Sequence, residues 1–292
     1  MKKQSFNQML HIVACGVLIG RLQQRDHREM AMGKLLANAN VRFLARALSA
    51  ALVGAMAFTA SANAQSNWSY SGSNGPNKWH EISGANSLCR AGRQQSPINI
   101  EGTDPAVMHR LKTNYLVTPV HLKNNRISVN MFYKKGSILT VGTKVYELEG
   151  FDFHTPAEHA IAGKRMPMSI QFMHRARNGS RAIIEVQVKE GRTNIAGQEL
   201  WELLPLEPDQ VMKRIKTLVN ARDLMPFDKA YYRYMGSMTT PPCREGVNWY
   251  ILKTPIEFSK EQIALIRGIV GGDTARPLQN RNNRIILDAR PQ

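Results

Sequence analysis

Apolar and polar side chains alternate with a period of two along much of this chain, and this alternation constrains its fold more than any other feature. It is clearest in residues 137–141 and 182–188. Successive side chains of a strand point to opposite faces of a sheet, so the pattern predicts many β-strands with buried faces. About 230 residues follow residue 64, without a repeat or a linker, which is enough for one domain. We therefore expect a mainly β (α+β) protein.

Helical signals are fewer. Val211, Ile215 and Leu218 follow one another at spacings of four and three, which predicts a helix over residues 208–221. Ser259, with Gln262 three positions later, forms the pattern of a capping box, and predicts that a second helix opens there.

The N-terminal segment has the composition of an export signal. An Ala-rich apolar stretch, residues 48–60, follows several basic residues and precedes the small-x-small pattern that ends at Ala64. We expect a leader over residues 1–64, with translation starting at Met30 or Met32, and a mature domain over residues 65–292. A lipoprotein cleavage box ending at Cys15 is disfavoured because its apolar run is too short.

The rest of the chain fits an exported protein. After residue 64 no stretch approaches the ~20 consecutive apolar residues of a transmembrane helix. We therefore expect a periplasmic or secreted protein without a membrane span. Cys89 and Cys243 are the two cysteines beyond the leader, and in an oxidising compartment they predict a disulfide that closes a long loop, worth on the order of 4 kcal/mol. Two unrelated buried thiols are the alternative.

The formal net charge is +17, and most of the excess lies after residue 64. It predicts either an evenly solvated basic surface or a patch that faces a polyanion such as lipopolysaccharide, a glycosaminoglycan or another acidic glycan. Nucleic acid is not expected as a partner outside the cytoplasm. The basic side chains form four small groups: Lys134 with Lys135; Lys164 with Arg165; Arg175, Arg177 and Arg181; and Arg276, Arg281 and Arg284.

Three stretches of sequence, in conserved order between about Trp68 and Ile286, resemble the alpha-class carbonic anhydrases. The resemblance implies one domain built on a central, twisted, mostly antiparallel sheet of about ten strands, with short peripheral helices. It also places the two cysteines where exported bacterial members have their disulfide. The stretches are Trp68-Ser69-Tyr70 with Gly75, Pro76, Trp79, Cys89 and residues 95–100; residues 153–159; and residues 236–243 with Gly246, Val247 and Trp249.

In that family two histidines, two residues apart on one strand, hold a zinc ion together with a third histidine on the neighbouring strand. The matching positions here are Asp152, His154 and Gln171, so two of the three histidines are replaced. The glutamate that orients the third histidine in the family falls at Ser169. These changes predict a degenerate zinc site.

The hydration chemistry of the family's zinc ion depends on the two histidines that are replaced here. Three neutral imidazoles leave the charge of the ion free to bring the pKa of bound water to about 7. An aspartate ligand raises that pKa, and a glutamine offers only a weak amide oxygen. We therefore expect a polar, water-filled cavity without metal; the alternative is a weak zinc site.

Other functional positions of the family are partly preserved. The resemblance implies that Thr239 would accept a hydrogen bond from zinc hydroxide and that Glu158 would orient Thr239. The proton-shuttle position falls at Asn125, which cannot titrate, so that function would be lost. Glu185 stands where the family commonly has glycine, and marks either a remodelled cavity or a solvent-facing position. The implied substrate pocket contains Met173, Ile183, Met238 and Thr240, while His159 and His174 match structural positions.

Two functions follow from these observations. The first is a periplasmic carbonic-anhydrase-like protein with little or no hydratase activity, retained as a binding module, with acidic glycans as the leading partner class. The alternative is a slow zinc-dependent carbonic anhydrase that converts carbon dioxide to bicarbonate through Asp152, His154 and Gln171.

Overall fold

The computed structural model describes residues 68–291. The expected leader, residues 1–64, lies outside the described residues. Within residues 68–291, no helix combines the length and the apolar character that a membrane span needs.

Strands dominate the described chain, and the helices are short. The strands are β1 (Asn99–Ile100), β2 (Asp104–Met108), β3 (Lys112–Asn114), β4 (Thr118–Asn124), β5 (Val129–Phe132), β6 (Ile138–Val141), β7 (Lys144–His154), β8 (Ala160–Ile161), β9 (Lys164–Arg165), β10 (Met168–Arg175), β11 (Arg181–Glu190), β12 (Val211–Val219), β13 (Tyr231–Ser237), β14 (Glu245–Leu252), β15 (Ile256–Phe258) and β16 (Leu287–Pro291). The α-helices are α2 (Trp79–Ile82), α3 (Leu88–Ala91), α4 (Gln198–Trp201) and α5 (Lys260–Ile269), and the 3-10 helices are η1 (Gly72–Asn74), η2 (Pro76–Lys78), η3 (Gly84–Asn86) and η4 (Ala221–Leu224).

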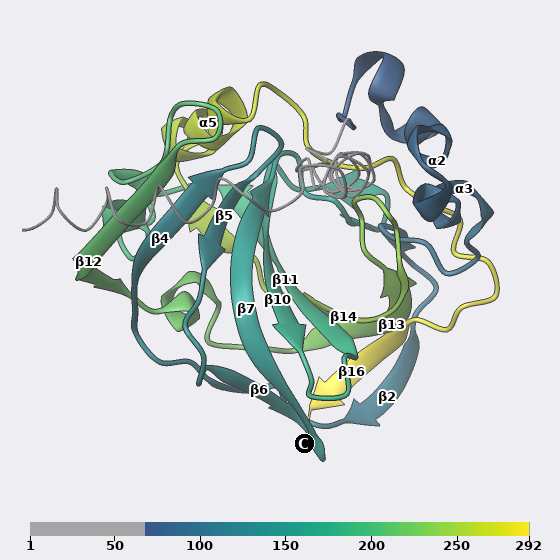
Figure 1. Ribbon diagram of the computed structural model, residues 1–292. Coiled ribbons are helices and arrows are strands. Elements are labelled where there is room, and N and C mark those ends of the chain that lie inside the picture. Colours follow the sequence, from purple (N-terminus) through teal and green to yellow (C-terminus); the bar gives the residue numbers. More distant parts are fainter. Residues whose placement is uncertain (1–67, 292) are drawn as a thin grey trace, which may run out of the picture. The chain divides into compact units, whose positions relative to one another are not determined.

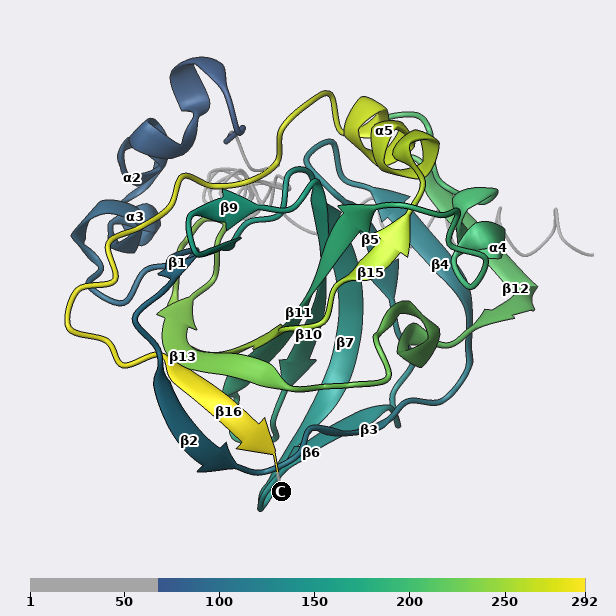
Figure 2. The ribbon, with the colours of Figure 1, turned by 180° about the vertical axis from the view of Figure 1, so that it is seen from behind.

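One large sheet of 13 strands organises this part of the chain (Figure 1). Its main path runs β12-β4-β5-β7-β10-β11-β14-β13-β16-β2, while β3, β6 and β15 pair at its sides. Most neighbours are antiparallel; β14 and β15 run parallel to β11, and β2 runs parallel to β16. Figure 2 shows β12 at one end of the path, and β16 beside β2 at the other. The expected mostly antiparallel sheet with short peripheral helices is confirmed.

The two faces of the central strands have different surroundings. On β7, Phe151 and Phe153 are buried in the larger hydrophobic cluster, so Asp152 and His154 point to the other face. On β11, Ala182, Ile184, Val186 and Val188 belong to the same cluster. The intervening β11 residues, at positions 183, 185 and 187, therefore share a face with Asp152 and His154, and this face bears the candidate site.

The helix predicted over residues 208–221 is wrong: residues 211–219 form the strand β12. This strand pairs with β4 along the edge of the sheet, for example at Met212 with Leu122. Val211, Ile215 and Leu218, the supposed buried face of a helix, are 47%, 80% and 52% exposed. β12 is also rich in β-branched residues, which fit a strand. The capping box at Ser259 and Gln262 is confirmed, since it opens α5.

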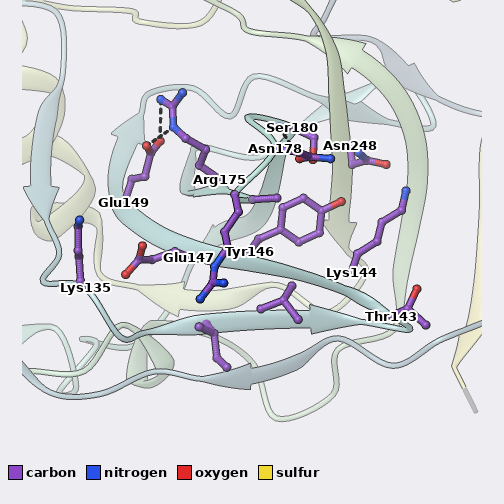
Figure 3. A pocket seen from close by; sticks show the side chains of 14 residues that line it. Lys135, Thr143, Lys144, Tyr146, Glu147, Glu149, Arg175, Asn178, Ser180 and Asn248 are labelled. Carbon is purple, nitrogen blue, oxygen red and sulfur yellow. Dashed lines mark hydrogen bonds and ion pairs between the residues drawn. The ribbon is translucent and has the colours of Figure 1, made fainter.

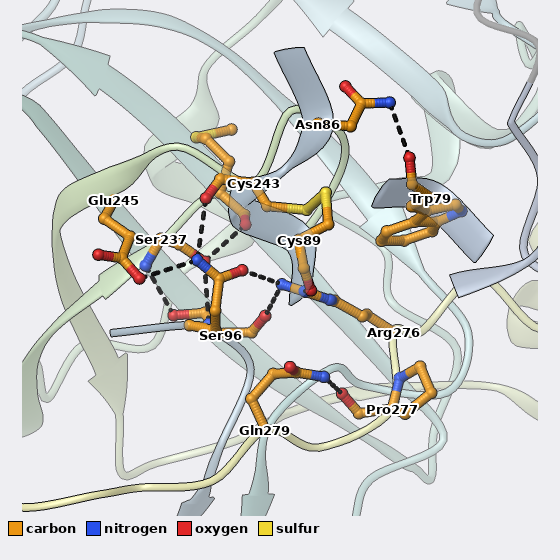
Figure 4. The surroundings of a disulfide bond; sticks show 12 residues. Trp79, Asn86, Cys89, Ser96, Ser237, Cys243, Glu245, Arg276, Pro277 and Gln279 are labelled. Carbon is orange, nitrogen blue, oxygen red and sulfur yellow. Dashed lines mark hydrogen bonds between the residues drawn. A yellow bond between two sulfur atoms is a disulfide. The ribbon is translucent and has the colours of Figure 1, made fainter. Parts of the chain in front are cut away.

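The disulfide between Cys89 and Cys243 is present, and it joins positions 154 residues apart. Figure 4 shows that Arg276 lies beside it. The Arg276 guanidinium is 1% exposed and donates 2.8 Å hydrogen bonds to the carbonyl oxygens of Ser96 and Cys89 and to the side chain of Gln95. Arg276 thus connects its own segment to residues 89–96 by buried hydrogen bonds, and the expectation that it belongs to a surface basic group is wrong.

Candidate functional site

Neighbouring strands bring the three expected metal positions together. β10 runs antiparallel to β7 with Gln171 opposite Asp152 and Ser169 opposite His154. Because residues two apart share a face, the side chains of Asp152, His154 and Gln171 converge on one side of the sheet. The structure therefore places these residues in one site, as the motif spacing predicted.

His154 lies between carboxylates. Its Nδ1 donates to the carbonyl oxygen of Thr274 at 2.7 Å. Its Nε2 faces Oδ1 of Asp152 at 3.6 Å and Oε2 of Glu158 at 3.9 Å. Burial by itself lowers the pKa of His154, but the charges of Glu158 and Asp152 outweigh it and raise the pKa to about 10. The two carboxylates therefore favour the protonated form of this imidazole.

Gln171 is held by two buried glutamates. Its amide nitrogen donates to Oε2 of Glu158 at 2.7 Å and to Oε2 of Glu185 at 3.1 Å. The other Glu158 oxygen accepts the backbone N–H of Arg276 at 3.2 Å. Both glutamates are fully buried. The amide thus supplies the hydrogen bonds that these carboxylates need in an apolar interior.

Glu185 extends these contacts to His159. Its Oε2 lies 2.8 Å from Nδ1 of His159, and its Oε1 accepts from Gln187 at 2.6 Å. Burial would raise the pKa of Glu185, but the adjacent His159 outweighs this effect and lowers it. Of the two readings of Glu185, the structure supports a remodelled interior and excludes a solvent-facing position. We call Glu158, Gln171, Glu185 and His159 the buried network.

The buried network continues towards the N-terminal part of the domain. Nε2 of His159 lies 2.6 Å from the hydroxyl of Tyr234, which lies 2.6 Å from Oγ of Ser96. Sequence reasoning did not identify Tyr234, Ser96 or Gln187 as part of the site. One signal was available, since Glu185 is a charged residue inside an otherwise apolar strand, and a buried charge requires partners.

Asn125, at the expected shuttle position, lies in the turn between β4 and β5. Its side-chain oxygen accepts the backbone N–H groups of Ile127 and Ser128. Its amide nitrogen donates to Asn130 at 2.7 Å, and Asn130 donates to Oδ2 of Asp152 at 3.4 Å. Amide side chains thus connect Asn125 to the site, but neither of them titrates.

The expected substrate pocket is partly assembled. Ile183 is buried in the second hydrophobic cluster, and Met173 and Met238 pack against that cluster. Thr239 is buried, whereas Thr240 is half-buried and its backbone carbonyl oxygen accepts the backbone N–H of Cys243. Among the hydrogen bonds of residues 68–291, none joins Thr239 to Glu158, whose oxygens are engaged by Gln171 and Arg276. Both residues are thus present, but without the hydrogen bond between them that the resemblance implied.

The donor set does not fit the zinc ion that the resemblance implies. Nε2 of His154 faces two carboxylates that favour its protonated form, and the Gln171 amide nitrogen donates to Glu158 and Glu185. Oδ1 of Asp152 is buried without a hydrogen-bond partner, and it remains free to ligate a metal ion. In the described part of the chain, no three His, Cys, Asp or Glu side chains are arranged to hold a metal. A site that binds zinc through imidazoles requires a different set of residues.

His174 lies outside this site. It is fully buried, and its Nε2 lies 2.6 Å from the hydroxyl of Tyr115. Burial lowers its pKa to about 3, so this histidine is neutral at physiological pH.

Comparisons with known proteins agree on one family. The family model described as eukaryotic-type carbonic anhydrase matches residues 74–290. A carbonic anhydrase of Neisseria gonorrhoeae is 33% identical over 249 residues, which cover 85% of this chain and 98% of that protein. The alpha-carbonic anhydrase of Thermovibrio ammonificans, solved with sulfanilamide, is 34% identical with a TM-score of 0.73, over 75% of this chain and 98% of that one. Dioscorin, solved with ascorbate, is 28% identical with a TM-score of 0.68, over 75% and 96%.

Proposed function

The chain belongs to the alpha-class carbonic anhydrase family, and we propose that it is an exported binding protein for acidic glycans that does not act as a zinc-dependent carbon dioxide hydratase. The observation that carries the proposal is the position of the Gln171 amide nitrogen between Glu158 and Glu185. This contact satisfies two buried carboxylates by protein hydrogen bonds. A metal at this place would have to break them.

His154 supports the same conclusion. A zinc ligand must present a neutral imidazole nitrogen to the ion, because the lone pair forms the bond. The two carboxylates at 3.6 and 3.9 Å instead favour a proton on Nε2 of His154. We infer that an imidazolium at His154 balances these carboxylates in place of a metal ion.

The binding part of the proposal rests on charge and on compartment. Residues 65–292 hold 31 Lys and Arg against 20 Asp and Glu, and this excess of 11 positive charges gives the exported domain a field that attracts polyanions. The Cys89–Cys243 disulfide supports export, since such bonds persist outside the cytoplasm. Acidic glycans are polyanions of that compartment. Dioscorin shares this fold but is not named a carbonic anhydrase, and one fold can host different functions.

Stopped-flow hydration of carbon dioxide at neutral pH tests the loss of activity. The natural protein, with its disulfide intact, is measured with and without added zinc. The reference is a fourfold variant, Asp152→His with Ser169→Glu, Gln171→His and Glu185→Gly, which restores the family residues. We expect no rate above background for the natural protein and a zinc-dependent rate for the variant. A zinc-dependent, sulfonamide-sensitive rate in the natural protein would instead establish a slow carbonic anhydrase.

A further inference from the structure

A large hollow lies at the other end of β7 from the candidate site. It has a volume of about 1130 Å³, and the β6–β7 and β10–β11 turns contribute to its wall (Figure 3). Along β7 its lining residues lie between eight residues (Lys144) and three residues (Glu149) before Asp152, or about 26 to 10 Å at 3.3 Å per residue. We call this hollow the hairpin pocket. It is distinct from the site that the family uses.

The hairpin pocket gathers basic side chains that are far apart in the sequence. Four cations line it, namely Lys135, Lys144, Arg175 and Arg177, together with two carboxylates, Glu147 and Glu149. Glu149 is neutralised by Arg175 at 2.5 Å and by Arg181 at 3.5 Å. Two of the basic groups noted in the sequence thus meet in this one place.

Three of these cations have no carboxylate partner. Among the ion pairs of residues 68–291, none involves Lys135, Lys144 or Arg177. All three are exposed at the pocket. Unpaired cations around a hollow provide strong, charge-assisted hydrogen bonds to an anionic group.

The wall of the hairpin pocket also has an unused polar group. The Tyr146 side chain is 1% exposed, and its hydroxyl lies near Ser180 without a hydrogen bond of normal geometry. Figure 3 shows its ring in the middle of the pocket, among Asn178, Ser180 and Asn248. A buried hydroxyl without a good partner costs free energy, so this part of the pocket wall is not fully satisfied within the chain.

The size and chemistry of the hollow indicate the ligand class. Ligand pockets usually have volumes of about 300–1,000 Å³, so this hollow accommodates a ligand of several rings. Its amides and hydroxyls suit sugar hydroxyls, and its free cations suit carboxylate or sulfate groups. We propose that the hairpin pocket binds a short acidic oligosaccharide, with Lys135, Lys144 and Arg177 contacting its anionic groups; this inference rests on the glycan-binding function proposed above.

Calorimetric titration of the full protein tests this assignment. The probes are a galacturonic acid tetramer and a sulfated heparin tetrasaccharide, which separate carboxylate from sulfate recognition, with uncharged maltotetraose as the neutral reference. The pocket variant is Lys135→Ala with Lys144→Ala and Arg177→Ala. The matched control, Arg214→Ala with Lys216→Ala and Lys260→Ala, removes the same charge from exposed positions elsewhere. Tyr146→Phe removes only the buried hydroxyl.

We expect the natural protein to bind at least one acidic probe and not maltotetraose. The pocket variant should bind that probe at least tenfold more weakly, the control variant within twofold of the natural protein, and Tyr146→Phe a few-fold more weakly. Equal losses of affinity in the pocket and control variants, or no loss in the pocket variant, would contradict the assignment of the hairpin pocket as the binding site. Glycan binding by the protein would then still stand. If the natural protein binds neither acidic probe, the proposed function itself fails.

Discussion

The amide nitrogen of Gln171 lies 2.7 Å from Oε2 of Glu158, and this contact joins β10 to the segment that follows β7. The same nitrogen reaches Glu185 on β11. A neutral donor therefore stands between two buried carboxylates.

Replacing the donor by a third carboxylate should destabilise the fold. In Gln171→Glu, a negative charge would face Glu158 and Glu185 without a hydrogen atom to share. We expect a loss on the order of 3 kcal/mol in the free energy of unfolding at pH 7. The loss should shrink near pH 4, where the new carboxyl is protonated. Urea denaturation measures both, with the exposed Gln198→Glu as the control; equal behaviour of the two variants would contradict the buried network.

Removing Glu185 should leave its partners unsatisfied. Glu185→Ala deprives His159, Gln171 and Gln187 of their common acceptor in a fully buried place. Each buried polar group that is left unsatisfied typically costs about 1–3 kcal/mol, so we expect a loss of this order or larger in the free energy of unfolding. Glu190→Ala, on the exposed end of β11, should change stability by less than about 0.5 kcal/mol. Chemical denaturation of both variants provides the comparison.

The pKa values of the two histidines on β7 and β10 should be shifted in opposite directions from the ordinary value. His154, with its pKa raised to about 10, should remain an imidazolium at pH 8. His174, with its pKa lowered to about 3, should remain neutral at pH 5. Nitrogen chemical shifts of the two imidazoles, recorded across this range, report each protonation state. A neutral His154 at pH 8 would contradict the role of imidazolium in the site.

The pH dependence of stability has a definite sign for each histidine. Between about pH 6.5 and 10 the folded chain holds a proton on His154 that the unfolded chain releases, so stability falls as the pH rises. Between about pH 3 and 6.5 His174 binds a proton in the unfolded chain but stays neutral in the folded chain, so stability rises with pH. His154→Gln should remove a decline on the order of 2–3 kcal/mol between pH 7 and 9. Urea midpoints at these two pH values measure it.

Loss of the disulfide should lower stability through the unfolded state. Cys89 and Cys243 close a loop of 154 residues, for which the chain-entropy model gives about 5 kcal/mol, slightly more than the value of order 4 kcal/mol expected from the sequence. We expect Cys89→Ser with Cys243→Ser, and the natural protein under reducing conditions, to unfold at similarly lower denaturant concentrations. Intact stability after reduction would show that the Arg276 contacts alone hold these segments together.

Much of the architecture could be predicted from the sequence, because it follows local rules. Alternation predicted the strands, and period two placed Asp152 and His154 on the face opposite Phe151 and Phe153. The capping box at Ser259 predicted the start of α5. The edge strand β12 was missed because its apolar spacing also fits a helix, and only backbone pairing with β4 decides between the two.

The buried network could not be predicted for a physical reason. Its hydrogen bonds join side chains from different segments, and each depends on the register between strands. Gln171 looks like a poor zinc ligand in the sequence, whereas in the structure it is a donor to two carboxylates. Arg276 similarly looks like a surface charge until its partners Ser96 and Cys89 are placed beside it.

Zinc affinity is the most direct test of the central claim that protein hydrogen bonds and an imidazolium replace the metal. The natural protein and the fourfold variant that restores the family residues are titrated with zinc against a fluorescent chelator of known affinity at pH 7. We expect the natural protein to bind zinc at least about 100-fold more weakly than the variant, since even the loss of ligand-orienting residues costs 10- to 100-fold. Equal, tight and stoichiometric binding by both proteins would contradict the account and identify Asp152, His154 and Gln171 as an unusual zinc site.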